Sequence, residues 1–335
     1  MYRLLLAVLV ALPLAGCASR SGPRPVRVGF IPKLIGIPYF DACKRGAEEA
    51  AKELNLKLDY NGPTSTDVNQ QIDLINQWAS AGEVAALCVA CNDPDQIARA
   101  LEEAREKHIA VITYDADSLP DARDFFVNQA SYDRVAEMMV DAMAEQLTPR
   151  GAGAVGILTS SVQAPNQSQW ARRVKAYAAR KYPDMTLLPE TEHGEDRDLG
   201  ITKAKALIQA HTDPDHPERG LKGIIGLTSV AVPAAAEAVR QAGKKGQIKV
   251  TGVSTPKDMR DYVKDGTVNT VILWNPVDLG YLTVYVADLV HKGTMPENGT
   301  IGAGRLGDKI TVTDREVLLG QPLRFNRDNI DQFDF

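Results

Sequence analysis

The chain has 335 residues, which is long for a single hydrophobic core, so two domains are expected. Its composition, with 44% hydrophobic and 24% charged residues, is ordinary for a soluble globular protein. The formal net charge of −5 gives no reason to expect a nucleic acid as a partner.

The first residues have the pattern of a bacterial lipoprotein signal. Arg3 precedes an apolar run over residues 4–14, which is too short to span a bilayer as a stable helix. The run leads to LAGC, which resembles a lipobox, the motif whose cysteine becomes the lipidated first residue of the mature protein. The alternative is a plain signal peptide with a chance cysteine. We expect a signal peptide over 1–17 with Cys17 lipidated, a linker over 18–25, and an exported domain in the periplasm or at the cell surface, held to a bacterial membrane only by its lipid.

From residue 26 onward, strand and helix patterns alternate. The expected strands are continuous apolar runs without polar alternation, which is typical of parallel strands buried on both faces. They cover 26–31, 84–90, 109–114, 153–161, 223–229, 248–254 and 267–274. The expected helices cover 93–108, 166–182, 233–243 and 276–293. Asp93 is placed as an N-cap before Pro94. Two consecutive sets of such units predict an α/β fold with two doubly wound parallel-sheet lobes.

Two glycine motifs and a cysteine pair suggest other chemistry. GAGAVG (151–156) and GAGRLG (302–307) match the dinucleotide pattern, but neither follows a strand and opens a helix, so no cofactor is expected. Cys88 and Cys91 form C-x-x-C at a strand end, where residues three apart point to opposite faces. Without a second pair or a nearby histidine, buried apolar roles are favoured over a metal or redox site. The five histidines are expected at the surface.

In open parallel sheets the ligand binds beyond the carboxyl ends of the strands, so residues that follow the predicted strands are expected to line a cleft between the lobes. These candidates are Lys33, Asp93, Asp115, Asp117, Asn166, Gln167, Thr228, Ser229, Ser254, Trp274 and Asn275. Tyr39 and Phe40 add flat apolar surfaces, as does Trp170, for which core packing is the alternative. The set contains no defensible pair of nucleophile and base.

Asp115 and Asp117 are the strongest polar signal in this set. In an extended strand, residues two apart share a face, so both carboxylates are expected to point into the cleft. They could perform acid–base chemistry or accept hydrogen bonds from sugar hydroxyls, and a turn with one helix-capping aspartate is the remaining alternative. Lys33 is expected to face them and to donate to the same hydroxyls.

Over residues 26–335 the chain resembles the periplasmic sugar-binding proteins of ABC importers, which have the type I fold. FIPKLIGIPYF, YNGPTSTDVNQQIDLIN, ACNDPDQIARAL and ITYDADS are similar to both the autoinducer-2-binding and the rhamnose-binding branches. WNPVDLGY, AGRLG and NIDQF are more similar to the rhamnose-binding branch. The resemblance implies a monomeric binding protein without catalytic activity, which captures a sugar by hinge closure and delivers it to ABC permease subunits.

The resemblance to the autoinducer-2 site would place Lys33, Asp115 and Gln167 on the ligand. The sequence departs from that site at Asn166, where that branch has aspartate, and at 227–229, where Leu-Thr-Ser replaces Pro-x-Ala. Because polar sites reject analogues that leave their groups unpaired, we expect a monosaccharide, either a deoxyhexose such as rhamnose or another aldose. Autoinducer-2 binding, or sensing together with a membrane receptor, is the alternative.

The topology of this family has three crossovers between the lobes, which form a three-strand hinge. Mapped onto the chain, the resemblance implies an N-lobe of residues 26–128 plus 276–300 and a C-lobe of 129–275 plus 301–335. The crossovers are expected at 125–130, at 273–276 and near Thr300.

Overall fold

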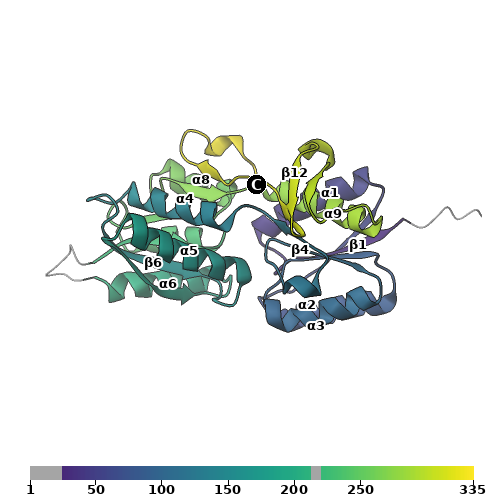
Figure 1. The fold of residues 1–335 in the computed structure, drawn as a ribbon. Coiled ribbons are helices and arrows are strands. Elements are labelled where there is room, and N and C mark those ends of the chain that lie inside the picture. The colour runs from purple at the N-terminus through teal and green to yellow at the C-terminus, as the bar shows by residue number, and fades with distance from the viewer. Residues whose placement is uncertain (1–24, 213–219) are drawn as a thin grey trace, which may run out of the picture.

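The computed structural model describes residues 25–212 and 220–335. Two α/β lobes lie side by side (Figure 1), as the sequence predicts. The N-lobe comprises residues 25–128 and 276–318, and the C-lobe comprises the described parts of 132–273 together with 323–335. The expected signal peptide, Cys17 and all but the last residue of the linker lie outside the described residues.

One eight-stranded sheet forms the centre of the N-lobe, in the order β11-β12-β13-β5-β4-β3-β1-β2. Its strands are β1 (Arg27–Ile31), β2 (Lys57–Tyr60), β3 (Ala86–Val89), β4 (Ala110–Tyr114), β5 (Phe125–Asn128), β11 (Gly299–Ile301), β12 (Ile310–Thr313) and β13 (Glu316–Leu318). The first five strands and β13 run parallel, whereas β12 pairs antiparallel with β11 and β13. Every residue of β3, β4 and β5 is buried, as expected for strands covered on both faces.

Helices cover both faces of this sheet. Figure 1 shows α1 (Pro38–Glu53) and α9 (Pro276–His291) on one face, and α2 (Val68–Ala81) and α3 (Pro94–Glu106) on the other. A Cβ atom on Gly46 would lie 1.7 Å from the carbonyl oxygen of Val277, and one on Gly280 would lie 1.8 Å from that of Cys43. Glycine at these positions therefore allows α1 and α9 to pack backbone against backbone.

The cysteines are buried, and those of the C-x-x-C motif point to opposite faces of the sheet, as predicted. Cys88 packs in the core under α1 and α9, whereas Cys91 packs in the core under α2 and α3. Cys43 is also a buried, free thiol. The expectation for the histidines is wrong at His193, which is fully buried beside the start of α6.

A four-stranded parallel sheet, β7-β6-β8-β9, forms the centre of the C-lobe, and a bridge from Val253 to Ile272 connects it to the β10–β14 ladder. These strands are β6 (Gly153–Thr159), β7 (Met185–Glu192), β8 (Leu221–Gly226), β9 (Lys249–Gly252), β10 (Val271–Leu273) and β14 (Leu323–Phe325). The helices are α4 (Tyr132–Ala144), α5 (Pro165–Lys181), α6 (Arg197–Ala210), α7 (Ala231–Gln241) and α8 (Pro256–Lys264). Helix α4 packs against α5, and α7 packs against both α6 and α8.

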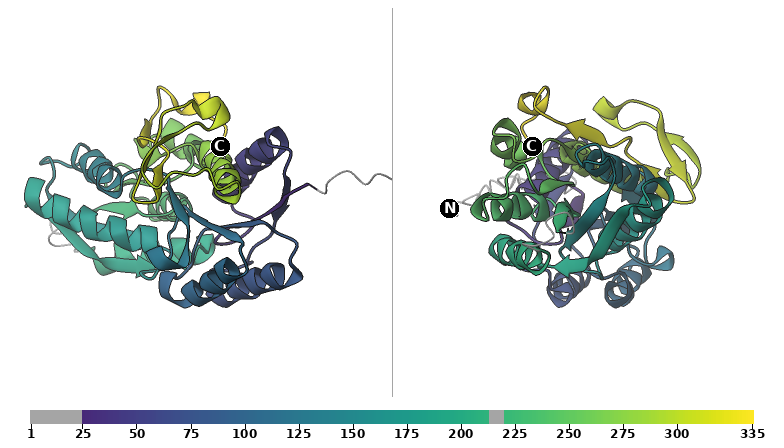
Figure 2. Two further views of the ribbon diagram at one scale, coloured as in Figure 1. Left: turned by 45° about the vertical axis from the view of Figure 1, so that its right-hand side comes forward. Right: turned by 90° about the vertical axis from the view of Figure 1, so that its left-hand side faces the viewer.

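The chain crosses between the lobes at residues 129–131, 274–275 and 319–322. The first crossover overlaps its predicted segment and the second lies within its own, but the third comes later than expected. Val317 pairs with Val127, so the strands up to β13 extend the N-lobe sheet and residues 301–318 do not belong to the C-lobe. The predicted return to the C-lobe holds only from β14 onward. The C-terminal segment, yellow in Figures 1 and 2, runs over the junction of the lobes.

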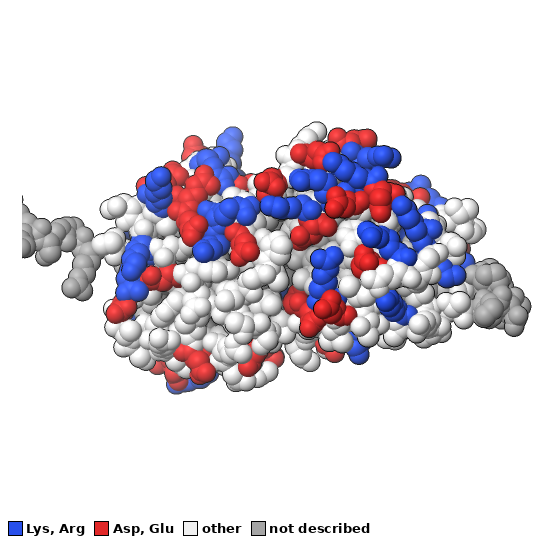
Figure 3. All heavy atoms as spheres, turned by 180° about the vertical axis from the view of Figure 1, so that it is seen from behind, with Lys and Arg blue, Asp and Glu red and all other residues white. Residues whose placement is uncertain are grey.

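The surface shows no strong segregation of charge on the face seen in Figure 3, where lysine and arginine alternate with aspartate and glutamate.

Among the described residues, no helix is both long enough and apolar enough to cross a membrane.

Candidate ligand-binding site

A pocket lies between the lobes, where the carboxyl ends of their parallel strands meet. Its lining residues come from both lobes: Lys33, Ile37, Tyr39, Phe40, Asp115, Asn166, Gln167, Trp170, Glu195, Leu227, Thr228, Ser229, Val253 and Trp274. The free volume of the cavity is about 30 Å³, because side chains of the two lobes meet directly. This position, beyond the strand ends, is where open α/β sheets bind their ligands.

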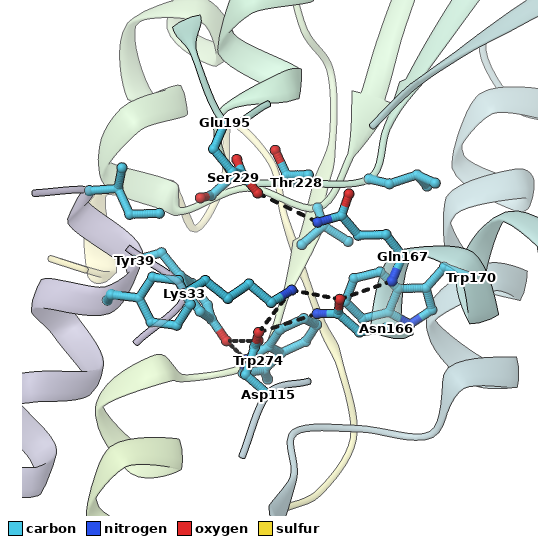
Figure 4. A pocket seen from close by; sticks show the side chains of 14 residues that line it. Lys33, Tyr39, Asp115, Asn166, Gln167, Trp170, Glu195, Thr228, Ser229 and Trp274 are labelled. Atoms are coloured by element: carbon cyan, nitrogen blue, oxygen red, sulfur yellow. Dashed lines mark hydrogen bonds and ion pairs between the residues drawn. The ribbon is translucent and has the colours of Figure 1, made fainter. Parts of the chain in front are cut away.

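A buried polar network bridges the lobes inside the pocket (Figure 4). The Lys33 ammonium lies 3.6 Å from a carboxylate oxygen of Asp115 and donates a 2.8 Å hydrogen bond to the side-chain oxygen of Asn166. The Asn166 amide nitrogen donates to Asp115 at 3.2 Å. Since Lys33 and Asp115 belong to the N-lobe and Asn166 opens α5 of the C-lobe, this network connects the two lobes.

Burial and neighbouring charge set the ionisation of the network. Burial raises the pKa of Asp115, and the nearby Lys33 ammonium opposes that rise. Burial, together with the charge of Asp115, raises the pKa of Tyr39 well above its ordinary value. The Tyr39 hydroxyl is therefore protonated and donates a 2.8 Å hydrogen bond to Asp115.

The two aspartates of ITYDADS diverge, contrary to the expectation that both point into the cleft. Asp115 has a left-handed backbone, with φ of 60°, so the chain is not extended there and residues two apart do not share a face. The Asp117 carboxylate instead accepts hydrogen bonds from the Arg123 guanidinium at 2.9 and 3.0 Å, away from the pocket lining. Only one carboxylate of the pair is therefore available to a ligand.

Aromatic rings form the wall beside this network. The indole of Trp274 donates a 2.9 Å hydrogen bond to the Tyr39 hydroxyl, and the two rings meet edge to face at 6.1 Å. Trp170 packs against Trp274 with ring centroids 5.6 Å apart, and Phe40 packs against Tyr39 at 5.1 Å. Trp170 thus belongs to both the core and the pocket lining. Such rigid rings provide apolar surface beside polar groups.

Two of the predicted polar residues line the pocket while supporting the backbone around it. The Gln167 side-chain oxygen accepts hydrogen bonds from the Ser160 backbone at 2.8 Å and from the Thr159 hydroxyl at 2.5 Å. The Thr228 hydroxyl accepts from the backbone of Ala231 at 3.0 Å. These bonds fix the loop after β6 and the start of α7.

Four predicted residues lie outside the pocket lining: Asp93, Asp117, Ser254 and Asn275. Asp93 and Asn275 cap the first turns of α3 and α9, so their side-chain oxygens are occupied by backbone N–H groups. The Ser254 hydroxyl donates to the carbonyl of Ser229 at 3.0 Å. These local roles direct the side chains to their own backbone or to a neighbour rather than to the cleft.

The structure adds residues that the sequence reasoning missed: Ile37, Glu195, Leu227 and Val253. Leu227 and Val253 directly follow β8 and β9, but the sequence pattern places them inside the longer predicted strands 223–229 and 248–254. Glu195 follows β7, whose residues are mostly half-buried or exposed and give no apolar run. Among the described residues, no group of three or more histidine, cysteine, aspartate or glutamate side chains is placed to hold a metal ion.

Comparison with known proteins agrees with this architecture. The family model described as a periplasmic binding protein domain matches residues 28–295. The ribose import binding protein of Bacillus subtilis is 25% identical over 82% of this chain and 85% of its own length.

Two solved structures show how closely the fold is shared. LsrB from Clostridium saccharobutylicum, solved in complex with AI-2, is 25% identical, with a TM-score of 0.85 over 92% of this chain and 100% of that chain. An ABC transporter solute binding protein from Clostridium phytofermentas, solved with bound L-rhamnose, is 27% identical, with a TM-score of 0.84 over 92% of this chain and 98% of that chain. Together with two α/β lobes that enclose a pocket at their strand ends, these matches show that the chain belongs to the periplasmic binding protein family.

Proposed function

We propose that the protein is the substrate-binding component of a sugar ABC importer, which captures a neutral monosaccharide in the interlobe pocket and delivers it to permease subunits. The observation that carries this proposal is the buried Lys33–Asp115–Asn166 network, which lies beside a wall of aromatic rings and draws on both lobes.

The chemistry of this network suits sugar hydroxyls. Lys33 donates, Asp115 accepts, and Asn166 does both, and hydrogen bonds to charged groups are stronger than those between neutral groups. The faces of Tyr39 and Trp274 provide flat surface for the C–H groups of a sugar ring. The lining thus offers both kinds of contact that a pyranose or furanose requires.

The aliphatic part of the lining favours a deoxyhexose such as rhamnose over a fully hydroxylated aldose. Ile37, Leu227 and Val253 line the pocket and have no polar side-chain atoms. A ligand methyl group packed against them loses contact with water favourably, whereas a hydroxyl there lacks a partner. The relative solved with bound L-rhamnose supports this choice.

Binding is expected to be coupled to movement of the lobes. The free cavity volume of about 30 Å³ is too small for a monosaccharide, so a sugar enters only if the lobes separate or the side chains move. Separation breaks the bonds of Asn166 to Lys33 and Asp115, and ligand hydroxyls then take their place. A ligand that contacts both lobes favours the closed form.

The proposal includes an exported, monomeric domain held to the membrane by a lipid on Cys17. It also includes binding without catalysis. Asp115 and Asp117 diverge, so they do not form the pair of facing carboxylates that glycoside hydrolysis uses.

The test is calorimetric titration of the domain from Ser19 onward with L-rhamnose, D-ribose, related aldoses and autoinducer-2. We expect one neutral sugar to bind tightly. Absence of heat with every sugar would contradict the proposal.

Autoinducer-2 is the second candidate ligand, because a relative with a TM-score of 0.85 was solved with AI-2. Lys33, Asp115 and Gln167, which match the autoinducer-2 site, line the pocket. Asn166 and residues 227–229 differ from the residues of that site. If autoinducer-2 binds and none of the sugars does, the protein would function in signal uptake or sensing instead.

A further inference from the structure

Glu195 reaches the pocket from the loop between β7 and α6, on the C-lobe side. Figure 4 shows its carboxylate beside Ser229 and the amide of Gln167, across the pocket from Lys33 and Asp115. It is the only acidic residue that the described part of the C-lobe contributes to the lining.

The backbone holds Glu195 in this position at a conformational cost. Its φ is 58°, a left-handed conformation that residues other than glycine adopt unfavourably, and Gly194 before it has φ of 62°. The backbone N–H groups of His193 and Gly194 donate to the carbonyls of Thr159 and Ser160, each at 2.9 Å. The loop is therefore fixed to the end of β6, and the strained residue is the one that lines the pocket. Strain of this kind is concentrated at functional sites.

The Glu195 carboxylate is incompletely satisfied by the protein. One oxygen lies 3.5 Å from the Gln167 amide nitrogen, which makes its shorter hydrogen bond, of 2.7 Å, to the Ser160 hydroxyl. The other oxygen is shielded from solvent and has no hydrogen-bond partner within the described ranges 25–212 and 220–335. A shielded carboxylate oxygen without a donor is unfavourable, so a donor group on the ligand would relieve this cost.

The charges of the lining indicate which donor fits. Lys33 is already paired with Asp115, whereas Glu195 has no cationic partner in the part of the chain that the structure describes. A carboxylate or phosphate on a ligand would meet this unpaired negative charge and be repelled. A hydroxyl of a neutral sugar donates to it without adding charge.

We propose that Glu195 is a specificity-determining residue, whose carboxylate accepts a hydrogen bond from a ligand hydroxyl that the ligand presents to the C-lobe. This inference rests on the proposed function, since it assigns one contact within the same pocket. It makes recognition two-sided: Lys33 and Asp115 bind one edge of the sugar, and Glu195 binds another.

The test compares Glu195→Gly and Glu195→Gln with the wild type by calorimetry and thermal unfolding. The probe is whichever of L-rhamnose, D-ribose or autoinducer-2 binds the wild type, together with its monodeoxy derivatives. Asp198→Asn is the matched control, because it removes a carboxylate from an exposed position in the first turn of α6, outside the pocket lining.

We expect Glu195→Gly to weaken binding roughly 10- to 100-fold, the loss typical of a hydrogen bond to a charged group. Its Tm should equal or exceed that of the wild type, because glycine adopts a positive φ without strain. Glu195→Gln keeps one acceptor oxygen and should lose less affinity. One monodeoxy derivative should bind the wild type weakly and lose little further affinity in Glu195→Gly.

Three results would overturn the assignment. Unchanged affinity in Glu195→Gly would show that Glu195 does not contact the ligand, while the proposed function would stand. An equal loss of affinity in Asp198→Asn would show that the weaker binding of Glu195→Gly results from the loss of a negative charge at long range and not from a lost contact. A lower Tm together with an equal loss for every monodeoxy derivative would indicate a purely structural role. A wild type that binds none of the probes would overturn the proposed function itself, and this inference with it.

Discussion

At the scale of single residues, removing one partner of the buried pair Lys33–Asp115 is expected to be strongly destabilising. The two side chains are 4% and 5% exposed. Lys33→Met leaves the Asp115 carboxylate buried without its cation, and breaking a buried pair in this way costs about 3–5 kcal/mol. We expect urea unfolding of Lys33→Met to show a loss of this size, and addition of Asp115→Asn to recover most of it. If the double variant is no more stable than Lys33→Met, the pair does not act in this way.

His193 gives the protein a pH-dependent stability. Its side chain is fully buried, neither ring nitrogen has a hydrogen-bond partner among the described residues, and burial lowers its pKa from 6.5. Below pH 6.5 the unfolded chain binds a proton that the folded protein takes up only at lower pH. Stability therefore falls as the pH decreases, by up to about 1.4 kcal/mol per pH unit from this residue. Urea unfolding across this range should show a smaller slope for His193→Leu, and an unchanged slope would refute the assignment.

The rule of strand ends predicts which residues come close to the pocket, but it does not predict the direction of their side chains. Lys33 lies two residues after β1 and Trp274 directly follows β10, so the rule of strand ends identified both. The Asp117 side chain does not line the pocket because the positive φ of Asp115 turns the chain. The Asn275 side chain does not line it because it caps α9. A single sequence shows the residue type at these positions but not the φ angle or the hydrogen bond that decides the direction of the side chain.

At the scale of elements, the contact between α1 and α9 depends on two glycines. In an exposed helix, replacing glycine by alanine stabilises by about 1 kcal/mol. In Gly46→Ala, however, the added Cβ would lie 1.7 Å from the Val277 carbonyl oxygen, which is backbone and cannot move aside cheaply. We expect Gly46→Ala to lose about 1–3 kcal/mol in urea unfolding. A gain in stability would mean that α9 can shift away from α1 without cost.

Some secondary-structure elements could be predicted from the sequence, whereas the position of others in the fold could not. β3 and β4 are buried on both faces, so their apolar runs identified them. In β12 buried and exposed residues alternate, because it belongs to an antiparallel hairpin with one open face. That pattern does not reveal which lobe the hairpin extends, and the boundary at 301, which was mapped from the family resemblance, is wrong because β13 pairs with β5 of the N-lobe.

For the molecule as a whole, Asn166 is expected to influence the balance between open and closed forms. Its side chain is hydrogen-bonded to both Lys33 and Asp115 of the other lobe. Asn166→Ala removes both bonds, so we expect small-angle X-ray scattering without ligand to give a larger radius of gyration than for the wild type. Arg172→Ala, which changes an exposed residue on the same helix, should leave the radius unchanged. Equal radii for wild type and Asn166→Ala would show that other contacts hold the lobes together.

The late position of the third crossover also determines when the protein can fold. β5 lies between β4 and β13, and β13 comes from residues almost two hundred positions further along the chain, Glu316–Leu318. Neither lobe is complete until residues 316–325, which form β13 and β14, have been synthesised, and pairings between such distant residues form slowly. A chain with this strand order therefore cannot complete either native sheet from its first 300 residues alone, so segments that are far apart in the sequence have to meet before the lobes are finished.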